Sequence, residues 1–318
     1  MISIILAIYN SNYKKIQFTL DSIISQSYSD YEIIIADDCS EEDPTHLIEE
    51  FMKEKNFSRY KIVRGEENRG TVRNLLNALA YANGEFVKTF GAGDGFFRTD
   101  SLYKMAQFIS KNECEFSYAQ TEMFYRMPEG KIHVEPFTFP FAVKDLFNRK
   151  FIGRDFLLYK DNVSGISMWY RKDLFREYLE RAKDSVKYVE DICQLEYLID
   201  GHRISCFKEC LFLYEGYSGI STSGSDSFSK LIHEDEKRYY RYLIEKYPDN
   251  KWLRKRLRLK KVIDIKNVRL RAVCVMIFSP LEIRIFIQRY WAKYVSKMYG
   301  KAEASSYLDK IVEMYKDD

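Results

Sequence analysis

The chain has 318 residues, of which 46% are hydrophobic and 31% are charged, a composition typical of a soluble globular protein with one large domain or two smaller ones. The six cysteines are scattered without a CxxC pair, which argues against a zinc site or a disulfide framework and favours reduced thiols. No signal peptide precedes the first apolar run, and no apolar run is long enough to span a bilayer, so we expect a cytoplasmic protein.

The net charge of +3 is unevenly distributed along the sequence. Residues 251–301 contain fifteen Lys and Arg side chains against two acidic ones, whereas residues 1–250 carry a net negative charge. A mildly acidic body with a basic C-terminal region points to an anionic surface as a partner.

The first hundred residues alternate between strand and helix patterns. Apolar runs predict buried strands over residues 3–9, 31–38, 60–65 and 84–90. Apolar residues recur at helical spacing between these runs, and Asp43 can cap one of the helices with Pro44 at its first position. This order predicts a doubly wound, mostly parallel α/β sheet, in which ligands bind at the carboxyl ends of the strands.

After residue 95 the pattern changes. Two strands joined by a turn at 128–130 are predicted within 115–135. They are followed by a long loop over 136–163, a strand and a helix over 164–175, a helix over 188–201, a strand over 203–216 and a loop over 217–227. From residue 228 onward the pattern is helical, and a capping box with Pro280 begins an amphipathic helix that ends at Gly300.

Polar residues follow three of the predicted strands and should meet at one edge of the sheet. They are Tyr9 and Asn10, then Asp37 and Asp38, then Asp94 in the glycine-rich loop 91–95. The first acidic pair can accept hydrogen bonds from a base or a ribose, or it can form a solvated turn.

Asp94 is the one acid of the loop "GAGDG". A dinucleotide-binding fingerprint would follow the first strand and carry a third glycine, whereas this loop follows the fourth strand and has Phe96 at that place. A single carboxylate can hold Mg²⁺ or Mn²⁺ when a substrate diphosphate supplies other ligands. The alternative is a turn in which Asp94 caps a helix. Arg73 and Asn74 begin another helix, whose dipole favours an anion, although an arginine there is also a common surface charge.

Taken in order, these segments resemble the motifs of the family 2 glycosyltransferases, which have the GT-A fold. The matching residues are "AIYN" at 7–10, "DDCS" at 37–40, "NRG" at 68–70, "VRN" at 72–74, "GAGD" at 91–94 and "ED" at 190–191. The resemblance covers residues 1–220. It rests on the order of the motifs, because each motif alone is short. Gly91 and Gly93 depart from it, since many members carry further acids there.

The resemblance implies a role for each matched residue. A nucleotide sugar would be bound by Ala7, Tyr9, Asn10, Asp37, Asp38, Asn68, Gly70, Arg73, Asn74 and Gly93. Asp94 would hold Mn²⁺ or Mg²⁺ at the leaving diphosphate. Asp191, beside Glu190, would be the general base that takes the proton of an acceptor hydroxyl. For this acidic pair the alternative is a solvated first helical turn, which acids favour.

The implied activity is inverting transfer of a hexose or N-acetylhexosamine from a UDP-linked sugar to a sugar hydroxyl of a growing bacterial glycan. The stretch "YEGYSGISTS" resembles a loop of transferases that build capsule and surface polysaccharides, which suggests a lipid-linked acceptor. Trp169 can stack on an acceptor sugar or belong to the core. A retaining transferase, a non-catalytic sugar-nucleotide-binding protein and a membrane-surface scaffold are the alternatives.

We divide the chain into a GT-A catalytic domain over 1–225, with a nucleotide-binding half (1–95) and an acceptor half (96–225), and a helical, basic region over 226–318. The helix after Pro280 has an aromatic stripe with basic flanks, which can lie on an anionic membrane or pack on the catalytic domain or a second subunit. The run "RKRLRLKK" favours the membrane, so we expect a peripheral protein at the inner face of a bacterial cell membrane. No nucleic-acid partner is expected, because the basic residues belong to no recognised nucleic-acid module.

Overall fold

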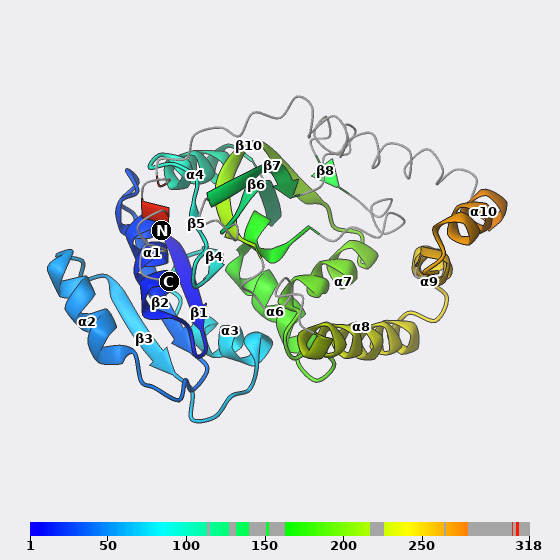
Figure 1. The fold of residues 1–318 in the computed structure, drawn as a ribbon, viewed down its shortest axis with the longest axis horizontal. Coiled ribbons are helices and arrows are strands. Elements are labelled where there is room, and N and C mark those ends of the chain that lie inside the picture. The colour runs from blue at the N-terminus through cyan, green and yellow to red at the C-terminus, as the bar shows by residue number, and fades with distance from the viewer. Residues whose placement is uncertain are drawn as a thin grey trace.

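The computed structural model describes residues 1–112, 115–126, 132–139, 151–152, 163–216, 226–263, 265–278, 307 and 310–311. Within these residues, ten strands form one mixed sheet (Figure 1). The strands are β1 (Ile2–Ile8), β2 (Tyr31–Asp37), β3 (Tyr60–Arg64), β4 (Phe86–Gly91), β5 (Gly95–Phe96), β6 (Phe116–Arg126), β7 (Ile132–Phe139), β8 (Phe151–Ile152), β9 (Met168–Arg171) and β10 (Ile204–Glu215). Their order is β3-β2-β1-β4-β9-β6-β10-β5, with β7 beside β6 and β8 beside β10.

The first four strands are parallel, and their apolar runs are buried because helices cover both faces of the sheet. The direction changes at β9, which is antiparallel to both β4 and β6, whereas β10 runs parallel to β6. The prediction of a mostly parallel, doubly wound α/β sheet is confirmed. Its four N-terminal strands lie within two residues of the ends expected from the sequence.

Two hydrophobic cores lie on opposite faces of the sheet. The helices are α1 (Tyr13–Ile24), α2 (Thr45–Glu54), α3 (Thr71–Leu79), α4 (Ser101–Lys111), α6 (Lys172–Ala182), α7 (Gln194–Ile199), α8 (Asp226–Lys246), α9 (Lys251–Ile263) and α10 (Val268–Phe278). Helices α1, α2 and α4 contribute to one core, and α3, α6, α7 and α8 to the other. Apolar residues three and four positions apart place one stripe of each helix against the sheet.

Some local expectations differ from the structure. Helix α2 begins at Thr45, one residue after Pro44, although the Asp43 carboxylate does accept a hydrogen bond from the Thr45 N–H at 2.9 Å. The helix expected over 188–201 begins as a 3₁₀ turn, Glu190–Cys193, before α7. The loop expected over 136–163 contains the end of β7 and the short strand β8, and its remaining residues up to 162 lie outside the described part, as do 217–225 and the helix expected after Pro280.

Helix α8 is packed into the main body, because Tyr239, Tyr240 and Leu243 belong to the same core as α3 and α6. Helices α9 and α10 lie at the end of the molecule opposite α2 (Figure 1). Near the C-terminus, Tyr307 returns to the N-terminal core and donates its hydroxyl proton to the Ser22 carbonyl of α1 at 3.1 Å. Among the described residues, no helix is long and apolar enough to cross a membrane.

Candidate donor and carboxylate site

The parallel register brings the ends of β1, β2 and β4 together, since Ala7 lies opposite Ala36 on one side and Gly91 on the other. The segments that follow these strands therefore leave the sheet at one edge. Ala7 is half-buried in this edge, whereas the Tyr9 ring is 43% exposed and presents an aromatic face there.

Asn10 ties two of these segments together. Its backbone lies in the left-handed region at φ 47°, its N–H donates to Ser40 Oγ at 2.8 Å, and its side-chain oxygen accepts from the Glu41 N–H at 2.8 Å. Asparagine adopts this conformation more readily than most residues. Asn10 thus fixes the loop that carries Tyr9.

The adjacent acids Asp37 and Asp38 are both buried and bonded within the protein. Asp37 accepts from the N–H and hydroxyl of Ser40 and forms an ion pair with Arg64. Asp38 accepts from the N–H groups of Arg69 and Gly70 at 3.0 and 2.6 Å. Desolvation raises the pKa of Asp38 despite these hydrogen bonds and the nearby charge of Lys187. Each acid holds a loop, and their predicted contacts with a nucleobase stay predictions.

The loop before α3 needs its glycine. Gly70 has φ +83°, and a Cβ there would lie 2.4 Å from Lys187 Cγ. Its N–H also approaches Asn68 Oδ1 at 3.2 Å. Asn74 points inward and donates to the Ala36 carbonyl at 2.8 Å, while Arg73 stays half-exposed in an ion pair with Asp184 at 2.7 Å. Of these residues, Arg73 is the one that presents charge to solvent.

A cavity of about 440 Å³ lies beside this loop. Its walls come from the loop before α3, from α3, from residues 183–187 after α6, and from α8, and the basic side chains in them are Arg69, Arg73, Lys183, Lys187 and Arg238. The volume is in the range of small-molecule pockets, and the excess of cations suits an anionic ligand.

The glycine-rich loop places Asp94 against β10. The Asp94 carboxylate accepts from the N–H of Glu215 at 3.0 Å and from that of Gly91 at 3.3 Å. Gly93 has φ +97°, and a Cβ there would lie 2.2 Å from Glu215 Oε2, so only glycine fits. Glu215 is itself buried and paired with Lys15 at 2.7 Å. Burial, together with the charge of Glu215, raises the pKa of Asp94 to about 7.

These residues fit a divalent cation. No cluster of three or more acidic, histidine or cysteine side chains that suits a metal occurs in the described part of the chain. Asp94 and Glu215 would supply hard oxygen ligands, and a bound cation would oppose the repulsion by which Glu215, itself paired with Lys15, raises the pKa of Asp94. Mg²⁺ and Mn²⁺ accept such sites when a substrate phosphate and water complete the coordination.

The acidic pair Glu190 and Asp191 lies at the start of the 3₁₀ turn before α7. Asp191 accepts a hydrogen bond from the Gly165 N–H at 3.1 Å, and a Cβ on Gly165 would lie 2.5 Å from Glu190 Oε1. Desolvation raises the pKa of Asp191 to about 6, with a contribution from Glu236 of α8. Desolvation and the neighbouring Asp191 raise the pKa of Glu190 further, to about 8. The Gly165 contact ties the acidic pair to the segment before β9, while both acidic side chains remain partly exposed.

Buried Lys88 connects the two acidic groups. It lies in β4, donates to the carbonyls of Ile166 and Met168, and packs its ammonium 3.9 Å from the centre of the Phe212 ring. Burial lowers the pKa of its ammonium, and the charges of Asp94 and Glu190 oppose that shift. The Ile166 carbonyl that Lys88 binds adjoins Gly165, whose N–H binds Asp191, so Lys88 links β4 to the segment that holds the acidic pair.

Sequence comparison assigns the family. Residues 3–179, more than half of the chain, match the profile of glycosyl transferase family 2. The chain belongs to glycosyl transferase family 2. The motif-based resemblance is thereby confirmed, and the GT-A architecture with it.

Curated relatives share parts of the chain. The "Putative teichuronic acid biosynthesis glycosyltransferase TuaG" of Bacillus subtilis (strain 168) is 32% identical over 118 residues, or 37% of this chain and 45% of TuaG. The UDP-Glc:alpha-D-GlcNAc-diphosphoundecaprenol beta-1,3-glucosyltransferase WfgD of Escherichia coli is 28% identical over 123 residues, or 39% of this chain and 46% of WfgD. The chain thus spans slightly less than half the length of these relatives.

A solved structure supports the same fold. S. aureus TarS 1-349 in complex with UDP-GlcNAc superposes with a TM-score of 0.52 at 15% identity, covering 99% of this chain and 89% of that one. At this identity the likeness concerns the fold alone.

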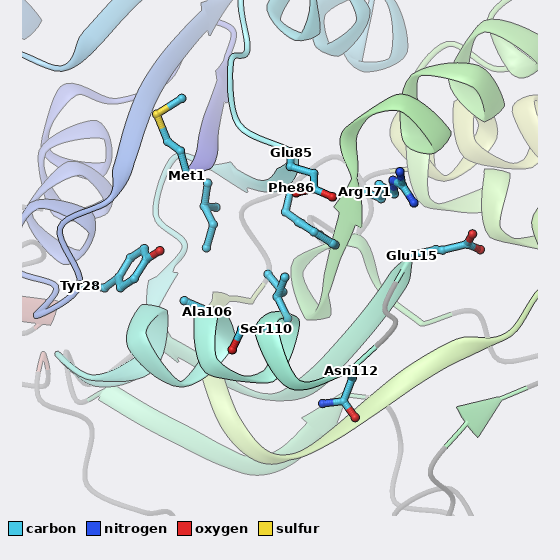
Figure 2. A pocket seen from close by; sticks show the side chains of 11 residues that line it. Met1, Tyr28, Glu85, Phe86, Ala106, Ser110, Asn112, Glu115 and Arg171 are labelled. Atoms are coloured by element: carbon cyan, nitrogen blue, oxygen red, sulfur yellow. The ribbon is translucent and has the colours of Figure 1, made fainter.

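Two other features of this family 2 chain lie away from the strand ends that carry the site. Trp169 is fully buried and packs edge-on against Phe108 and Phe212, so it belongs to the core and not to an acceptor platform. A second cavity of about 560 Å³ lies beside Met1, Phe86 and Arg171, where β4 begins and β9 ends (Figure 2). Because it lies at the amino ends of the parallel strands, it is remote from the acidic groups.

Proposed function

We propose that the chain is an inverting glycosyltransferase that moves a hexose or N-acetylhexosamine from a UDP-linked sugar to a sugar hydroxyl of a bacterial surface glycan. The observation that carries the proposal is a series of contacts between two acidic groups: Lys88 of β4, the strand that leads into the Asp94 loop, donates to the Ile166 carbonyl, and the adjacent Gly165 N–H binds Asp191. Family membership supports it, as do the names of WfgD, which includes UDP-Glc, and TarS, which was solved with UDP-GlcNAc.

Asp191 is the proposed general base. Its pKa of about 6 leaves it ionised at neutral pH yet basic enough to draw off the proton of an acceptor hydroxyl as the oxygen attacks the anomeric carbon. The Gly165 N–H holds one carboxylate oxygen, which leaves the other for the acceptor. Desolvation and the adjacent Asp191 raise the pKa of Glu190, which places a second carboxyl group beside the proposed base.

Asp94 and Glu215 are the proposed residues for Mn²⁺ or Mg²⁺. When bound, such an ion would neutralise the charge that the leaving diphosphate gains. The donor would lie over the strand ends, where Tyr9 is exposed, and beside the basic cavity that adjoins α3.

The test compares UDP binding with UDP release from UDP-sugars in the presence of acceptor glycan. In the variant Asp191→Asn, we expect turnover to fall by about 10²- to 10⁴-fold, as for loss of a general base, while UDP affinity stays within about twofold of wild type. Asp173→Asn, an exposed acid at the start of α6, is the matched control and should keep full activity. Wild-type turnover in Asp191→Asn would reject the assignment of the base.

A wild-type protein that binds UDP but releases none from any UDP-sugar, with or without Mn²⁺, would instead support a non-catalytic sugar-nucleotide-binding protein.

We also propose that the acceptor is lipid-linked and that the protein associates peripherally with the anionic inner face of the cell membrane through 251–301. In the described part of this region, α9 and the start of α10 expose Arg254, Arg258, Lys261, Lys266 and Arg269. Helix α10 also exposes Leu270, Val273, Met276 and Ile277. Basic and apolar side chains together suit an anionic lipid surface, and the name of WfgD includes a diphosphoundecaprenol acceptor.

A further inference from the structure

Residues 185–189 link the cavity beside α3 to the acidic pair at 190–191. Ser185, Val186 and Lys187 line the cavity, and the chain then continues directly into Glu190. The position of this segment therefore affects both the shape of the cavity wall and the orientation of Asp191, the proposed base.

Asp235 of α8 holds the segment from one side. This residue is fully buried, and one oxygen of its carboxylate accepts from three successive N–H groups, those of Lys187 at 3.0 Å, Tyr188 at 2.6 Å and Val189 at 3.4 Å. The other oxygen pairs with Arg238, whose Nε donates to the Ser185 carbonyl at 3.3 Å. A charged acceptor that serves three backbone donors fixes the loop more firmly than neutral hydrogen bonds would.

The start of α3 holds the segment from the other side. The Val72 N–H donates to the Lys187 carbonyl at 3.1 Å, and Gly70 leaves just enough room for the Lys187 stem. Lys187 is thus fixed at its backbone between α8 and the loop whose N–H groups bind Asp38.

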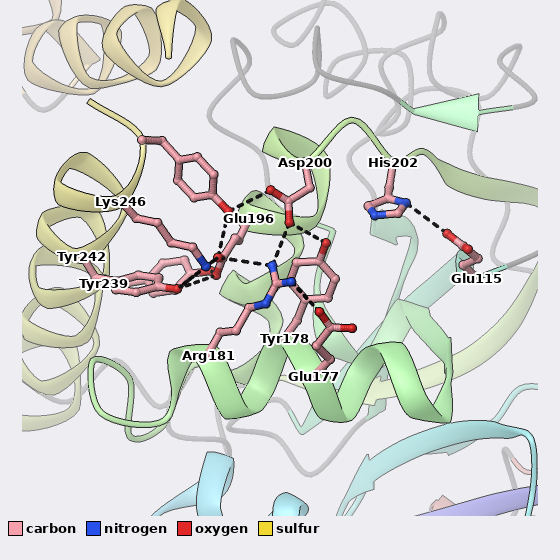
Figure 3. A network of polar contacts seen from close by, with 11 residues as sticks. Glu115, Glu177, Tyr178, Arg181, Glu196, Asp200, His202, Tyr239, Tyr242 and Lys246 are labelled. Atoms are coloured by element: carbon pink, nitrogen blue, oxygen red, sulfur yellow. Dashed lines mark hydrogen bonds and ion pairs between the residues drawn. The ribbon is translucent and has the colours of Figure 1, made fainter. Parts of the chain in front are cut away.

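Helix α8 is itself anchored, so Asp235 is a rigid support. Figure 3 shows the buried carboxylate of Glu196 in α7, which accepts from Tyr242 at 3.0 Å and pairs with Lys246 at 2.5 Å, both on α8. Arg181 of α6 reaches the same carboxylate at 3.5 Å. A buried network of this kind holds α8 in one position against α6 and α7.

Lys187 differs from the other cations of the cavity. Arg69, Arg73, Lys183 and Arg238 each form an ion pair with an acid, namely Glu67, Asp184, Glu180 and Asp235. Lys187 forms none with any residue that the structure describes, and its ammonium lies 5.2 Å from the centre of the Tyr188 ring. Its charge is therefore available in the cavity for a ligand.

We propose that Lys187 binds the diphosphate of the donor nucleotide and that Asp235 is the positioning residue for both Lys187 and the acidic pair. This inference rests on the proposed function, because it takes the ligand of the cavity to be a nucleoside diphosphate. It assigns α8 a part in the donor site, although α8 lies beyond the residues that match the family profile.

The first test compares UDP with uridine, which lacks the phosphates, by calorimetric titration in the presence of Mn²⁺. Lys187→Met keeps the stem and removes the charge. It should weaken UDP binding by about 10- to 100-fold, the usual cost of losing a hydrogen bond between charged groups, and leave uridine binding unchanged. Lys104→Met, at a lysine of α4 that is paired with Glu209 outside the cavity, is the matched control and should change UDP affinity less than about threefold.

Unchanged UDP affinity in Lys187→Met would overturn the inference while leaving the proposed function intact. Equal losses for UDP and uridine would also overturn it, because they would show a steric role. Failure of the wild-type protein to bind UDP at all would overturn the proposed function and the inference together. Since Lys187 is partly exposed, the substitution does not threaten folding.

The second test concerns Asp235→Asn, which keeps the size of the side chain but removes its charge. We expect the variant to bind UDP more weakly and to bind uridine with nearly unchanged affinity. We also expect lower turnover at saturating donor, because the acidic pair is displaced as well. Combined with Lys187→Met, the losses in UDP affinity should be less than additive, since both act through one ammonium group. A lower melting temperature with an unchanged ratio of UDP to uridine affinity would show a merely structural role and reject the positioning part.

Discussion

At the residue scale, the proton of Asp94 couples the site to the stability of the fold. Its pKa is about 7 in the folded protein but about 4 in an unfolded chain, because burial and Glu215 disfavour the charged form. The folded state therefore binds more protons between these values, and the free energy of unfolding must fall as the pH rises through them. Glu190 and Asp191, whose pKa values are also raised, act in the same direction.

In the variant Asp94→Asn the side chain cannot ionise. The contribution of Asp94 to the pH dependence of the free energy of unfolding should therefore be absent. Without added metal, we expect the wild-type protein to lose about 2 kcal/mol more stability than Asp94→Asn between about pH 5 and about pH 8. Denaturant unfolding at both pH values, in the presence of a chelator, measures the difference. The two proteins having parallel pH profiles would contradict the raised pKa. Adding Mn²⁺ should reduce the loss in wild type and have little effect in the variant.

Residue by residue, sequence reasoning found the motif-bearing positions but not their partners. Glu215 contacts Asp94 from 121 positions further along the chain, and no local sequence pattern predicts a contact over that separation. Lys88 is a charged residue in an apolar strand, yet it is fully buried and donates to the carbonyls of Ile166 and Met168. Asp235 stands in an ordinary charged helix. These residues act through tertiary contacts, which spacing along a single sequence does not encode.

At the element scale, periodicity predicted what depends on local burial. Strands β1, β2 and β4 are largely buried and appear as apolar runs, whereas the edge strand β3 buries one residue, Val63. The helices between them appear as apolar stripes, because both signals follow from which face meets the core. The basic run in α9 was interpreted as facing an anionic surface. Arg256 within it is instead buried and donates to the Tyr240 hydroxyl at 2.7 Å, while Arg254, Arg258 and Lys261 remain exposed.

The docking of Tyr307 onto α1 is an element-scale contact that can be tested by truncating one side chain. Tyr307 is 2% exposed and accepts a hydrogen bond from Gln26 Nε2 at 2.9 Å. Tyr307→Ala should lower the free energy of unfolding by about 3 kcal/mol, as for other buried aromatic truncations. Tyr307→Phe, the matched control, should cost only about 1 kcal/mol because it loses the hydroxyl alone. A Tyr307→Ala protein as stable as wild type would show that this segment is not docked.

At the scale of the whole molecule, α9 and α10, which expose basic side chains, lie at the end opposite α2 (Figure 1). We expect binding to vesicles that contain anionic lipid, weak binding to neutral vesicles, and loss of binding at high salt. Replacing both Arg258 and Lys261 by Ser should weaken binding by about 10- to 30-fold, at roughly 1 kcal/mol per basic residue. Lys53→Ser in α2 is the control and should have no effect.

Vesicle co-sedimentation measures these affinities. Equal binding to neutral and anionic vesicles would contradict the electrostatic part of the proposal. No binding to either, together with a dimer in sedimentation equilibrium, would assign the exposed apolar side chains of α10 to a second copy of the chain.

The position of Tyr307 and Ile311 in the core formed by β1 and α1 also bears on how the protein is made. On the ribosome, β1 and α1 emerge before the side chains that complete their packing, since Tyr307 is translated 285 positions after Ser22 of α1. The other face of the sheet, with α3, α6, α7 and α8, has its own apolar residues in place earlier. The nascent chain must therefore keep part of this core open until Tyr307 and Ile311 have been made and can reach it.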